Sequence, residues 1–331
     1  MDNAVFLTEA GPGVGFGHLV RMSALRSFFI KKGIKTLLLL KLAGNEYNQQ
    51  DYGSDIEIAN WLTDRKRLND LSSFFPVVII DSYLAAEEYY AFLKTVFKKV
   101  VAFDDYNRIK YSVDMIVNSN IYGDLMHYGN QRSKVIGGRN YVIIREAILE
   151  HKDVFKLKSD VYRILITIGG SDYRKLLPRI IDAIKKLHYE ILVVAANDSY
   201  KHHLEKTFKA KNLTTYGCLS AKEMASLLLN ADIAISSAGQ TLNELAFLGI
   251  PTIAILMDKD QVYNMEAYYK SGFLLEKLKW DDVGLISRIL ELLKKMKSND
   301  LRSYLSNKSR DLFNGRGLEN LFHVIYATAR H

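Results

Sequence analysis

Short apolar runs alternate with longer segments of helical period along the whole chain, and this alternation constrains the fold more than any other feature. Each run is rich in Val, Ile and Leu, which is typical of strands buried on both faces of a parallel sheet. Parallel strands need crossover connections, usually helices. The pattern therefore predicts an α/β fold. The runs are Ala4–Leu7, Thr36–Leu40, Val77–Ile80, Val100–Phe103, Arg163–Thr167, Ile191–Ala195, Asp232–Ile235 and Thr252–Ile255.

The runs fall into two groups, separated by a polar stretch at 146–162 in which Lys and Asp dominate. A chain of 331 residues has room for about two domains of roughly 150 residues each. We predict two doubly wound, Rossmann-like domains at 1–150 and 160–310, facing a cleft, with the linker in the polar stretch. We expect the last segment, 311–331, to form a terminal helix that packs back on the first domain.

The charge of the chain does not point to nucleic acid. Lys and Arg number 45 against 37 Asp and Glu, a formal net charge of +8, but basic and acidic residues are interspersed instead of forming one stripe. A small anionic substrate or a membrane surface would use the same charge. We predict no nucleic-acid partner, leave a peripheral membrane contact open, and expect a monomer.

Membrane spans, export and disulfides are also disfavoured. The strongest apolar run, Leu37–Leu40, ends at Lys41, far short of the roughly 18 residues that a membrane helix needs. Asp2 stands where a signal peptide would carry positive charge. Cys218 is the single cysteine, so it has no intramolecular partner, and no Cys/His cluster of zinc-finger type is present. We expect a cytoplasmic protein.

Small or polar residues follow several of the predicted strands, where doubly wound folds bind their ligands. The first such segment, Gly11–His18, matches neither a Walker loop nor Gly-x-Gly-x-x-Gly. Its glycines allow positive φ and close approach of a ligand. His18 falls in the first turn of the next helix, whose N-terminus favours a neutral ring that can accept a proton. We interpret His18 as a candidate general base; the alternative is a residue that only caps the turn.

Two further strand ends could bind an anion. Gly169-Gly170-Ser171-Asp172 is a glycine turn before a helix, where phosphate can meet a helix N-terminus. The segment Ser236 to Glu244 also opens a helix, with the backbone of Gly239, Gln240 and Thr241 at its start. Glu244 lies about one turn in, where a carboxylate can accept hydrogen bonds from a ribose diol. Its apolar neighbours predict that Glu244 is buried. Burial of an unpaired carboxylate would cost free energy, so Glu244 is expected to have a partner.

The second of these segments resembles the UDP-sugar half of the glycosyltransferase-B superfamily, especially its MurG branch. The matching residues are Ser237-Ala238-Gly239-x-Thr241-x-x-Glu244, Gly249-x-Pro251, Gln261-x-x-Asn264 and the upstream segment 219–229 with Met224.

The whole chain resembles the PseG/SpsG family more narrowly. The residues that carry this resemblance are Gly15-Phe16-Gly17-His18-Leu19-Val20-Arg21, Ile80-Asp81-Ser82-Tyr83, Phe103-Asp104-Asp105, Asn118, Tyr141 to Glu146, Gly169 to Asp172 and Gly315-Arg316-Gly317. The characterised members of that family are UDP-2,4-diacetamido-2,4,6-trideoxy-β-L-altropyranose hydrolases of pseudaminic acid biosynthesis.

The resemblance implies a role for each matching residue. His18 would be the base that activates water, and Tyr83, in the sugar pocket, would be the second catalytic residue. Glu244 would bind ribose, and the Leu219 backbone would bind the uracil edge with Met224 nearby. Residues implied on the diphosphate side are Gly169, Gly170, Ser237, Ala238, Gly239, Gln240 and Thr241. Residues implied on the sugar side are Gly15, Gly17, Arg21, Asn120, Arg145, Gln261 and Asn264.

The resemblance also implies the stereochemistry and the absence of cofactors. Water attacking opposite to UDP would invert the anomeric centre without the carboxylate pair of ordinary glycosidases. No cofactor or metal is implied, so Asp104-Asp105 is not read as a metal motif. Glu9 and Leu7 stand where some members carry aspartate and arginine, so the sugar bound by this chain can differ.

Three functions compete at this point. The first is a hydrolase that transfers the sugar to water. The second is a transferase that uses the same UDP-sugar and a lipid or protein acceptor, with a segment such as Phe28–Lys32 touching a membrane. The third is a UDP-sugar-binding module without activity, which the retained histidine loop disfavours.

Overall fold

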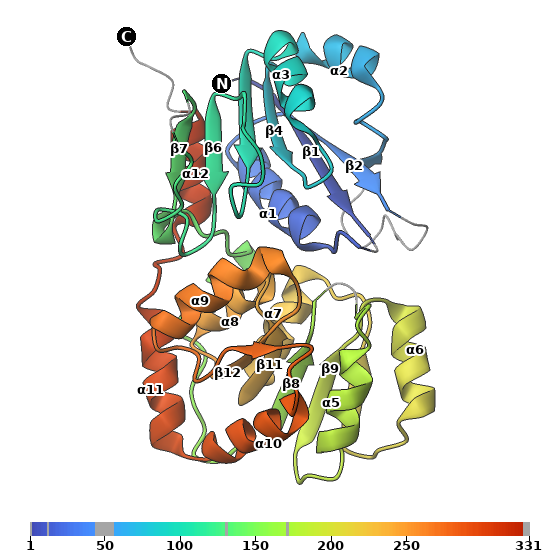
Figure 1. The fold of residues 1–331 in the computed structure, drawn as a ribbon, viewed down its shortest axis with the longest axis vertical. Coiled ribbons are helices and arrows are strands. Elements are labelled where there is room, and N and C mark those ends of the chain that lie inside the picture. Colours follow the sequence, from blue (N-terminus) through green and yellow to red (C-terminus); the bar gives the residue numbers. More distant parts are fainter. Residues whose placement is uncertain (1, 12, 44–55, 130–131, 170–171, 327–331) are drawn as a thin grey trace. The chain divides into compact units, whose positions relative to one another are not determined.

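The computed structural model describes residues 2–11, 13–43, 56–129, 132–169 and 172–326. The chain divides into two compact units (Figure 1). Unit 1 combines the residues up to Ile143 with those from Gly315 onward, and unit 2 is Ile144–Asn314.

Unit 1 is built on a parallel sheet of seven strands. Its order is β3-β2-β1-β4-β5-β6-β7, and every neighbouring pair is parallel. The order reverses where β1 lies beside β4, which is the topological switch point of a doubly wound sheet. The strands are β1 (Ala4–Ala10), β2 (Thr36–Leu42), β3 (Ile56–Ile58), β4 (Val77–Asp81), β5 (Lys99–Phe103), β6 (Met115–Asn118) and β7 (Lys134–Gly137).

Helices cover both faces of this sheet because β1 is apolar on both of its sides. Val5 and Leu7 belong to a buried cluster with side chains of α2 (Arg65–Ser72) and α3 (Glu87–Val96). Phe6 points the other way, since side chains alternate along a strand, and its ring meets Phe29 of α1 (Gly17–Lys31) at 5.6 Å.

The C-terminal helix α12 (Gly317–Tyr326) belongs to unit 1, although it follows unit 2 in the sequence. Phe322 packs edge-on against Phe29 and Phe28 of α1, at 5.3 and 6.1 Å between ring centroids. In the sequence, 28–32 was the candidate segment for membrane contact. Two residues of that segment, Phe28 and Phe29, contact α12; Phe29 is buried and Ile30 is exposed, and the membrane contact stays a prediction.

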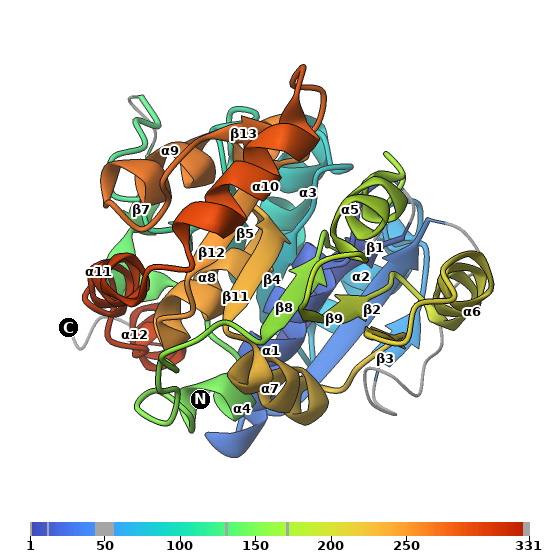
Figure 2. The ribbon, with the colours of Figure 1, turned by 90° about the horizontal axis from the view of Figure 1, so that it is seen from below.

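Unit 2 repeats the doubly wound plan with six parallel strands, in the order β10-β9-β8-β11-β12-β13. Its central strands lie side by side in Figure 2, and β8 meets β11 at the switch point. The strands are β8 (Arg163–Thr167), β9 (Glu190–Val194), β10 (Leu213–Tyr216), β11 (Ile233–Ser237), β12 (Thr252–Leu256) and β13 (Leu278–Lys279).

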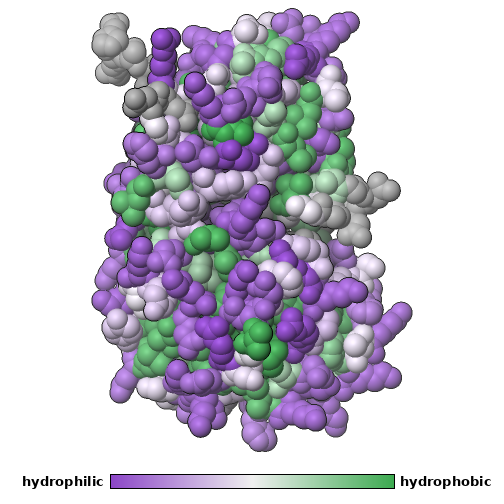
Figure 3. Space-filling view, viewed as in Figure 1, coloured by the Kyte–Doolittle hydropathy of each residue, from purple (hydrophilic) through white to green (hydrophobic). Residues whose placement is uncertain are grey.

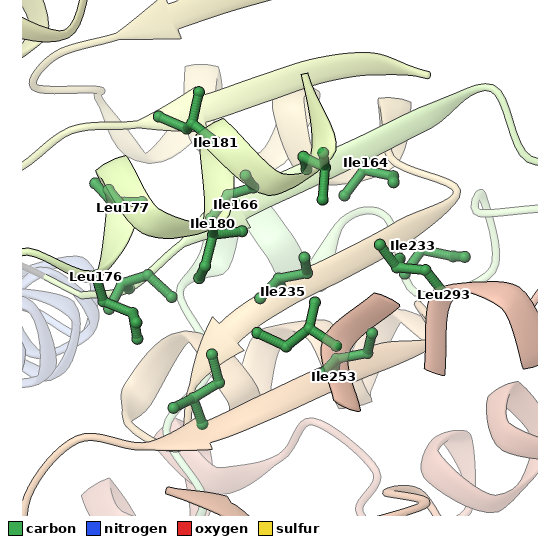
Figure 4. Packing of buried hydrophobic residues seen from close by; sticks show 14 of the residues in the cluster. Ile164, Ile166, Leu176, Leu177, Ile180, Ile181, Ile233, Ile235, Ile253 and Leu293 are labelled. Carbon is green, nitrogen blue, oxygen red and sulfur yellow. The ribbon is translucent and has the colours of Figure 1, made fainter. Parts of the chain in front are cut away.

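Some of the helices of unit 2 bury one continuous apolar core against one face of the sheet. Figure 4 shows Ile180 and Ile181 of one of them, α5, among strand residues such as Ile166 and Ile235. The helices of the unit are α4 (Glu146–Leu149), α5 (Leu176–Ile184), α6 (Asp198–Thr207), α7 (Ala221–Asn230), α8 (Gln240–Leu248), α9 (Val262–Lys270), α10 (Leu285–Lys295) and α11 (Asn299–Arg310). Short 3₁₀ turns are η2 (Arg139–Tyr141) in unit 1 and η3 (Lys259–Gln261) in unit 2.

The polar stretch 146–162, predicted to hold the inter-domain linker, is part of unit 2. Arg302 of α11 is fully buried and donates to the carbonyls of Lys158 and Ser159 at 3.0 and 2.7 Å. Arg310 donates to the carbonyl of Phe155 at 2.7 Å. The contact boundary therefore lies at Ile143, seven residues before the expected end of the first domain at 150.

One face of the molecule (Figure 3) is mixed and largely polar. On the face shown in Figure 3, hydrophilic side chains dominate and hydrophobic ones occur in small groups. No helix in the described part of the chain combines the length and apolarity needed to cross a membrane.

Gly317 offers a test of how tightly α12 docks. A Cβ at this position would lie 1.9 Å from the carbonyl oxygen of Val142, in the backbone just after η2. Backbone cannot move aside as a flexible side chain does, so we expect Gly317→Ala to destabilise unit 1 by about 1–3 kcal/mol, the usual cost of overpacking. Urea unfolding followed by circular dichroism measures the change.

Gly17→Ala is the matched control, because a Cβ at Gly17 would meet no described atom within 4 Å. We expect its urea midpoint to match that of the parent. Equal midpoints for both variants would contradict the tight contact at α12.

Candidate functional site

The polar strand-end residues of unit 1 lie along one edge of the sheet, since all its strands run parallel. At the switch point, β1 is followed by the glycine loop and α1, and β4 ends at Asp81. Asp105 follows β5, and Asn118 ends β6. These groups come from segments far apart in the sequence, and the strand order β1-β4-β5-β6 brings them together.

The glycine loop closes on itself between β1 and α1. Gly11 and Gly15 exchange two backbone hydrogen bonds, of 3.1 and 2.8 Å. Gly11 has a φ of +128°, and a Cβ there would lie 2.1 Å from the carbonyl oxygen of Ala43, so no other residue fits. The helix α1 begins at Gly17, directly after the loop. His18 therefore lies in its first turn, with its side chain buried.

His18 forms a dyad with Asp81. Its Nδ1 lies 2.7 Å from Oδ1 of Asp81. Since an ionised carboxylate only accepts hydrogen bonds, Nδ1 carries the proton in this contact. Among the residues that the structure describes, Nε2 has no hydrogen-bond partner. The neutral ring therefore presents its free acceptor on Nε2, as a general base requires.

The pKa of His18 is shifted in the direction opposite to the sequence-based expectation. Burial by itself disfavours the charged ring, but the charge and hydrogen bond of Asp81 outweigh it, so the pKa of His18 lies above its ordinary value. The expectation of a ring kept neutral by the helix N-terminus was wrong in direction. Asp81 instead stabilises the imidazolium that forms when the base takes up a proton.

Arg21, one turn further along α1, was expected to bind substrate, but the chain itself occupies its donors. Nε and Nη2 donate to Asp81 at 2.8 Å each, and Nη1 and Nη2 donate to Asp105 at 2.7 and 3.2 Å. Nη1 also donates to Ser119 Oγ at 3.4 Å. A guanidinium has five N–H donors, so none remains for a ligand. The geometry gives Arg21 a positioning role.

Asp105 joins this network to Tyr83 and Asn120. The Tyr83 hydroxyl donates to Oδ2 at 2.7 Å, and Nδ2 of Asn120 donates to Oδ1 at 2.7 Å. Asn120 Nδ2 also donates to Asn118 Oδ1 at 3.0 Å. Both amide protons of Asn120 are thus used, so the expected sugar contact could come only from its carbonyl oxygen. The Tyr83 ring stands edge-on against the His18 ring, with 4.2 Å between centroids.

The two neighbouring aspartates have different structural roles. Asp104 accepts from the hydroxyls of Tyr111 and Tyr128 at 2.6 and 2.8 Å, and from two backbone amides, those of Asn107 and Arg108. Four donors saturate this carboxylate, so Asp104 organises the loop after β5, while Asp105 takes part in the site.

Glu9 holds the turn that carries Tyr83. Its carboxylate accepts from the Ser82 hydroxyl and the Tyr83 amide at 2.6 Å each, and from the Leu84 amide at 3.2 Å. Sequence reasoning assigned no role to Glu9, Asp81 or Asp105, although all three lie in strand-end clusters that could have been searched for partners of His18.

In unit 2, the expected diphosphate residues gather at the switch point between β8 and β11. A Cβ at Gly169, which has a φ of +94°, would lie 3.3 Å from Ser237 Oγ, and one at Gly239 would lie 3.5 Å from Nε2 of Gln261. The helix α8 begins after Gly239 without a side-chain cap. Its first amides are therefore suited to an anion. Gly170 lies outside the described residues.

Asn264 of α9 lies beside this helix start. Its Nδ2 donates to the carbonyl of Ala238 at 2.8 Å, while its buried Oδ1 has no partner in the described part of the chain. Gln261 Oε1 accepts from the Met257 amide at 3.1 Å, which leaves its amide nitrogen toward Gly239. The unit thus offers an uncapped helix start, an unsatisfied acceptor and an amide donor at one place.

The sequence suggested that the glycine turn after β8 leads directly into a helix, but the structure shows that it does not. The helix α5 starts only at Leu176, and its amides at Leu176 and Leu177 donate to the carboxylate of Asp172 at 2.7 and 2.9 Å. Asp172 therefore caps this helix, which removes its N-terminus as an anion site.

Glu244 is buried, as expected, but it is not unpaired. Arg145 Nε and Nη2 donate to its two carboxylate oxygens at 2.6 and 2.7 Å. A carboxylate has about four acceptor positions, so two remain for a ribose diol after the bidentate pair. Arg145 also neutralises a buried negative charge that would otherwise repel a diphosphate.

The residues expected around uracil flank the start of α7. Leu219 lies in the loop between β10 and that helix, and Met224 is buried on the helix itself. Gln240 and Thr241 form the first turn of α8. The carboxyl ends of β8, β10 and β11 therefore carry the expected nucleotide residues along one sheet edge, and Gln261 and Asn264, expected on the sugar side, follow β12 at the same edge.

Residues 134–315, which include all of unit 2, match the family described as glycosyltransferase family 28 C-terminal domain. The chain is 25% identical over 333 aligned residues to the spore coat polysaccharide biosynthesis protein SpsG of Bacillus subtilis, an alignment that covers 94% of each protein.

A second relative comes from Helicobacter pylori and is named pseudaminic acid cytidylyltransferase and UDP-2,4-diacetamido-2,4,6-trideoxy-beta-L-altropyranose hydrolase. The identity is 23%, over 78% of this chain and 45% of that protein, so the alignment spans less than half of the relative. Among solved structures, MurG of Acinetobacter baumannii is similar, with a TM-score of 0.66 and 16% identity over 98% of this chain and 100% of that chain. The likeness confirms the predicted pair of Rossmann-like domains of the GT-B fold.

The buried dyad predicts an acid-sensitive unit 1. Arg21 and His18 outweigh burial and hold the pKa of Asp81 well below its ordinary value. The carboxylate therefore contributes stability above its unfolded pKa, and this contribution is lost as pH falls through the folded pKa. We expect Asp81→Asn to destabilise the protein by about 3–5 kcal/mol at pH 7, the usual effect of removing one partner of a buried ion pair, and to reduce the loss of stability on acidification.

Urea unfolding between pH 3 and pH 7 measures both effects. Asp182→Asn is the control, because Asp182 forms an exposed pair with Lys185, and we expect it to behave like the parent. A pH dependence of Asp81→Asn that parallels the parent would contradict the assignment.

Proposed function

Because the chain belongs to the glycosyltransferase family 28 C-terminal domain family, as a relative of SpsG and PseG, we propose that it is a UDP-sugar hydrolase. The substrate we propose is a UDP-activated 2,4-diacetamido-2,4,6-trideoxy sugar, and the products are UDP and the free sugar with inverted anomeric configuration. The name of the Helicobacter pylori relative supports this substrate class. The free sugar would enter the biosynthesis of a nonulosonic acid such as pseudaminic acid.

Unit 2 has the groups needed to bind the nucleotide. The uncapped start of α8 at Gly239 to Thr241 would bind the diphosphate through backbone N–H groups, with Ser237 and Gly169 beside it. The remaining acceptor positions of Glu244 would bind the ribose diol, and the Leu219 backbone the uracil edge. Arg145 balances the charge of Glu244, so the pocket does not oppose an anionic ligand.

Unit 1 has the groups needed to activate water, and the His18–Asp81 dyad is the observation that carries the proposal. Nε2 of His18 takes a proton from water while the water oxygen attacks the anomeric carbon. The C–O bond to UDP breaks, and its electron pair leaves with the phosphate oxygen. The Nδ1 proton stays on His18, hydrogen-bonded to Asp81 at 2.7 Å, which stabilises the imidazolium.

A glycosyltransferase is the second candidate, because the family match is to a glycosyltransferase domain. Both candidates share the nucleotide site and differ in whether water or another hydroxyl attacks. Incubation with UDP-2,4-diacetamido-2,4,6-trideoxy-altrose in buffer without acceptor, followed by NMR, detects UDP release and the anomer formed. Turnover to the inverted free sugar supports the hydrolase; UDP release only after addition of a lipid acceptor supports the transferase.

Removal of the base tests the role of His18. We expect His18→Gln to lower kcat by about 10²–10⁴, the usual contribution of a positioned base, and to leave UDP affinity unchanged. UDP release and isothermal titration with UDP measure the two effects. His127→Gln, at an exposed histidine of the same unit, is the control. Unchanged turnover in His18→Gln would remove His18 from the mechanism.

Ribose binding by Glu244 has a separate test. We expect Glu244→Gln to weaken UDP binding by about 1.5–3 kcal/mol, the contribution of hydrogen bonds to a charged group. If Glu244 accepts from the 2′-hydroxyl, the variant should also lose the parent's preference for UDP over 2′-deoxy-UDP.

Titration calorimetry with both nucleotides gives these values, with Glu291→Gln of α10 as the control. Equal loss for both nucleotides would mean that Glu244 acts only through Arg145 and not on the ribose.

A further inference from the structure

Five side chains of unit 1, including His18 itself, form a closed circuit of contacts. Four of them are buried, and Tyr83 is half-buried. His18 contacts Asp81, Asp81 contacts Arg21, Arg21 contacts Asp105, and Asp105 accepts from Tyr83, whose ring returns to His18. We propose that Arg21 and Asp105 are positioning residues for His18: they fix the carboxylate that accepts the hydrogen bond from Nδ1 and set the net charge that surrounds the ring. The proposal rests on the proposed role of His18 as the base.

The geometry of Arg21 explains how Asp81 is held. Oδ1 of Asp81 receives both His18 Nδ1 and Arg21 Nη2, at 2.7 and 2.8 Å, while Oδ2 receives Arg21 Nε at 2.8 Å. This two-point grip prevents rotation of the carboxylate. Nη1 and Nη2 of the same guanidinium donate to Asp105, which holds the arginine side chain in this position.

Asp105 also limits the movement of the imidazole. It accepts from the Tyr83 hydroxyl at 2.7 Å, and the Tyr83 ring lies against His18 with an interplanar angle of 86°. The turn that carries Tyr83 is held independently by Glu9. Asp105 therefore reaches His18 by two routes, through Arg21 and through Tyr83.

The charges around His18 favour its protonated form. Asp81 from β4, Arg21 from α1 and Asp105 after β5 sum to −1, so the circuit is neutral only when His18 is charged. Burial opposes the charged ring; the two aspartates raise the pKa of His18 and Arg21 lowers it. Two other titratable groups lie in or beside the circuit: the Tyr83 hydroxyl, which donates to Asp105, and Glu9, which accepts from the Tyr83 amide. Every variant below leaves them unchanged.

Three variants change this charge in known steps. With neutral His18, the sum is −2 in Arg21→Gln, 0 in Asp105→Asn and −1 again in the double variant. We expect the pKa of His18 to rise by about one unit in the first, fall by about one in the second, and return near the parent value in the third. Histidine NMR titration of the intact protein measures it, with His18→Gln identifying the signal.

Kinetics give the second readout. The acid limb of the kcat/KM pH profile should move in the same direction as the NMR pKa, and kcat should fall in the double variant because the grip on Asp81 is lost. Arg21→Lys keeps the charge and loses the fork, so it should keep the pKa and lower kcat. Asp105→Asn is nearly isosteric, so it tests the proposal even where Arg21→Gln does not fold.

The possible failures are distinguishable. An NMR pKa of His18 that is the same in Asp105→Asn and the parent would overturn the inference. Shifts of the expected signs in the NMR pKa, with a pH profile that does not follow them, would support the circuit and count against His18 as the base. Loss of folding stability alone, with unmoved pKa and pH profile, would reduce Arg21 and Asp105 to structural residues.

Discussion

The guanidinium of Arg21, held between Asp81 and Asp105, is the interaction on which the site in unit 1 depends. All of its donors point to groups of the chain, and its pKa is raised well above the ordinary value because the two aspartates outweigh burial. Two carboxylates this close could not both stay ionised in a buried place without a cation between them. Arg21 therefore keeps Asp81 charged, and a charged Asp81 orients His18.

Unit 2 also contains a buried carboxylate whose charge is balanced by an arginine, here in a single ion pair. Glu244 is buried, and Arg145 cancels its charge through a bidentate contact. The difference is in what remains free. Arg21 has no donor left, whereas the Glu244 carboxylate retains acceptor positions after Arg145 is bound. The contacts of Arg21 thus organise neighbouring residues, whereas the Arg145–Glu244 pair leaves acceptor positions for a ligand.

Much of the fold could be predicted because parallel strands covered on both faces must be apolar along their length. All eight predicted runs coincide with strands. Five further strands contain none of these runs, and each has only two to four residues: β3, β6, β7, β10 and β13. Four of these are edge strands, where one side lacks a neighbour and the sequence need not be continuously apolar.

The sequence by itself determined the two doubly wound units, the strand ends that carry polar residues and the place of His18 after the glycine loop. Only the tertiary structure decided which polar groups pair. The strand order places β1 beside β4, so His18 and Asp81, which are 63 positions apart in the sequence, form a hydrogen bond. Only the tertiary structure shows that the donors of Arg21 are used within the chain and not by a ligand. It also shows that Asp172 accepts from the first amides of α5. A donor or acceptor pairs with whichever group lies near it in the folded chain, and spacing along the sequence does not show which groups will be near.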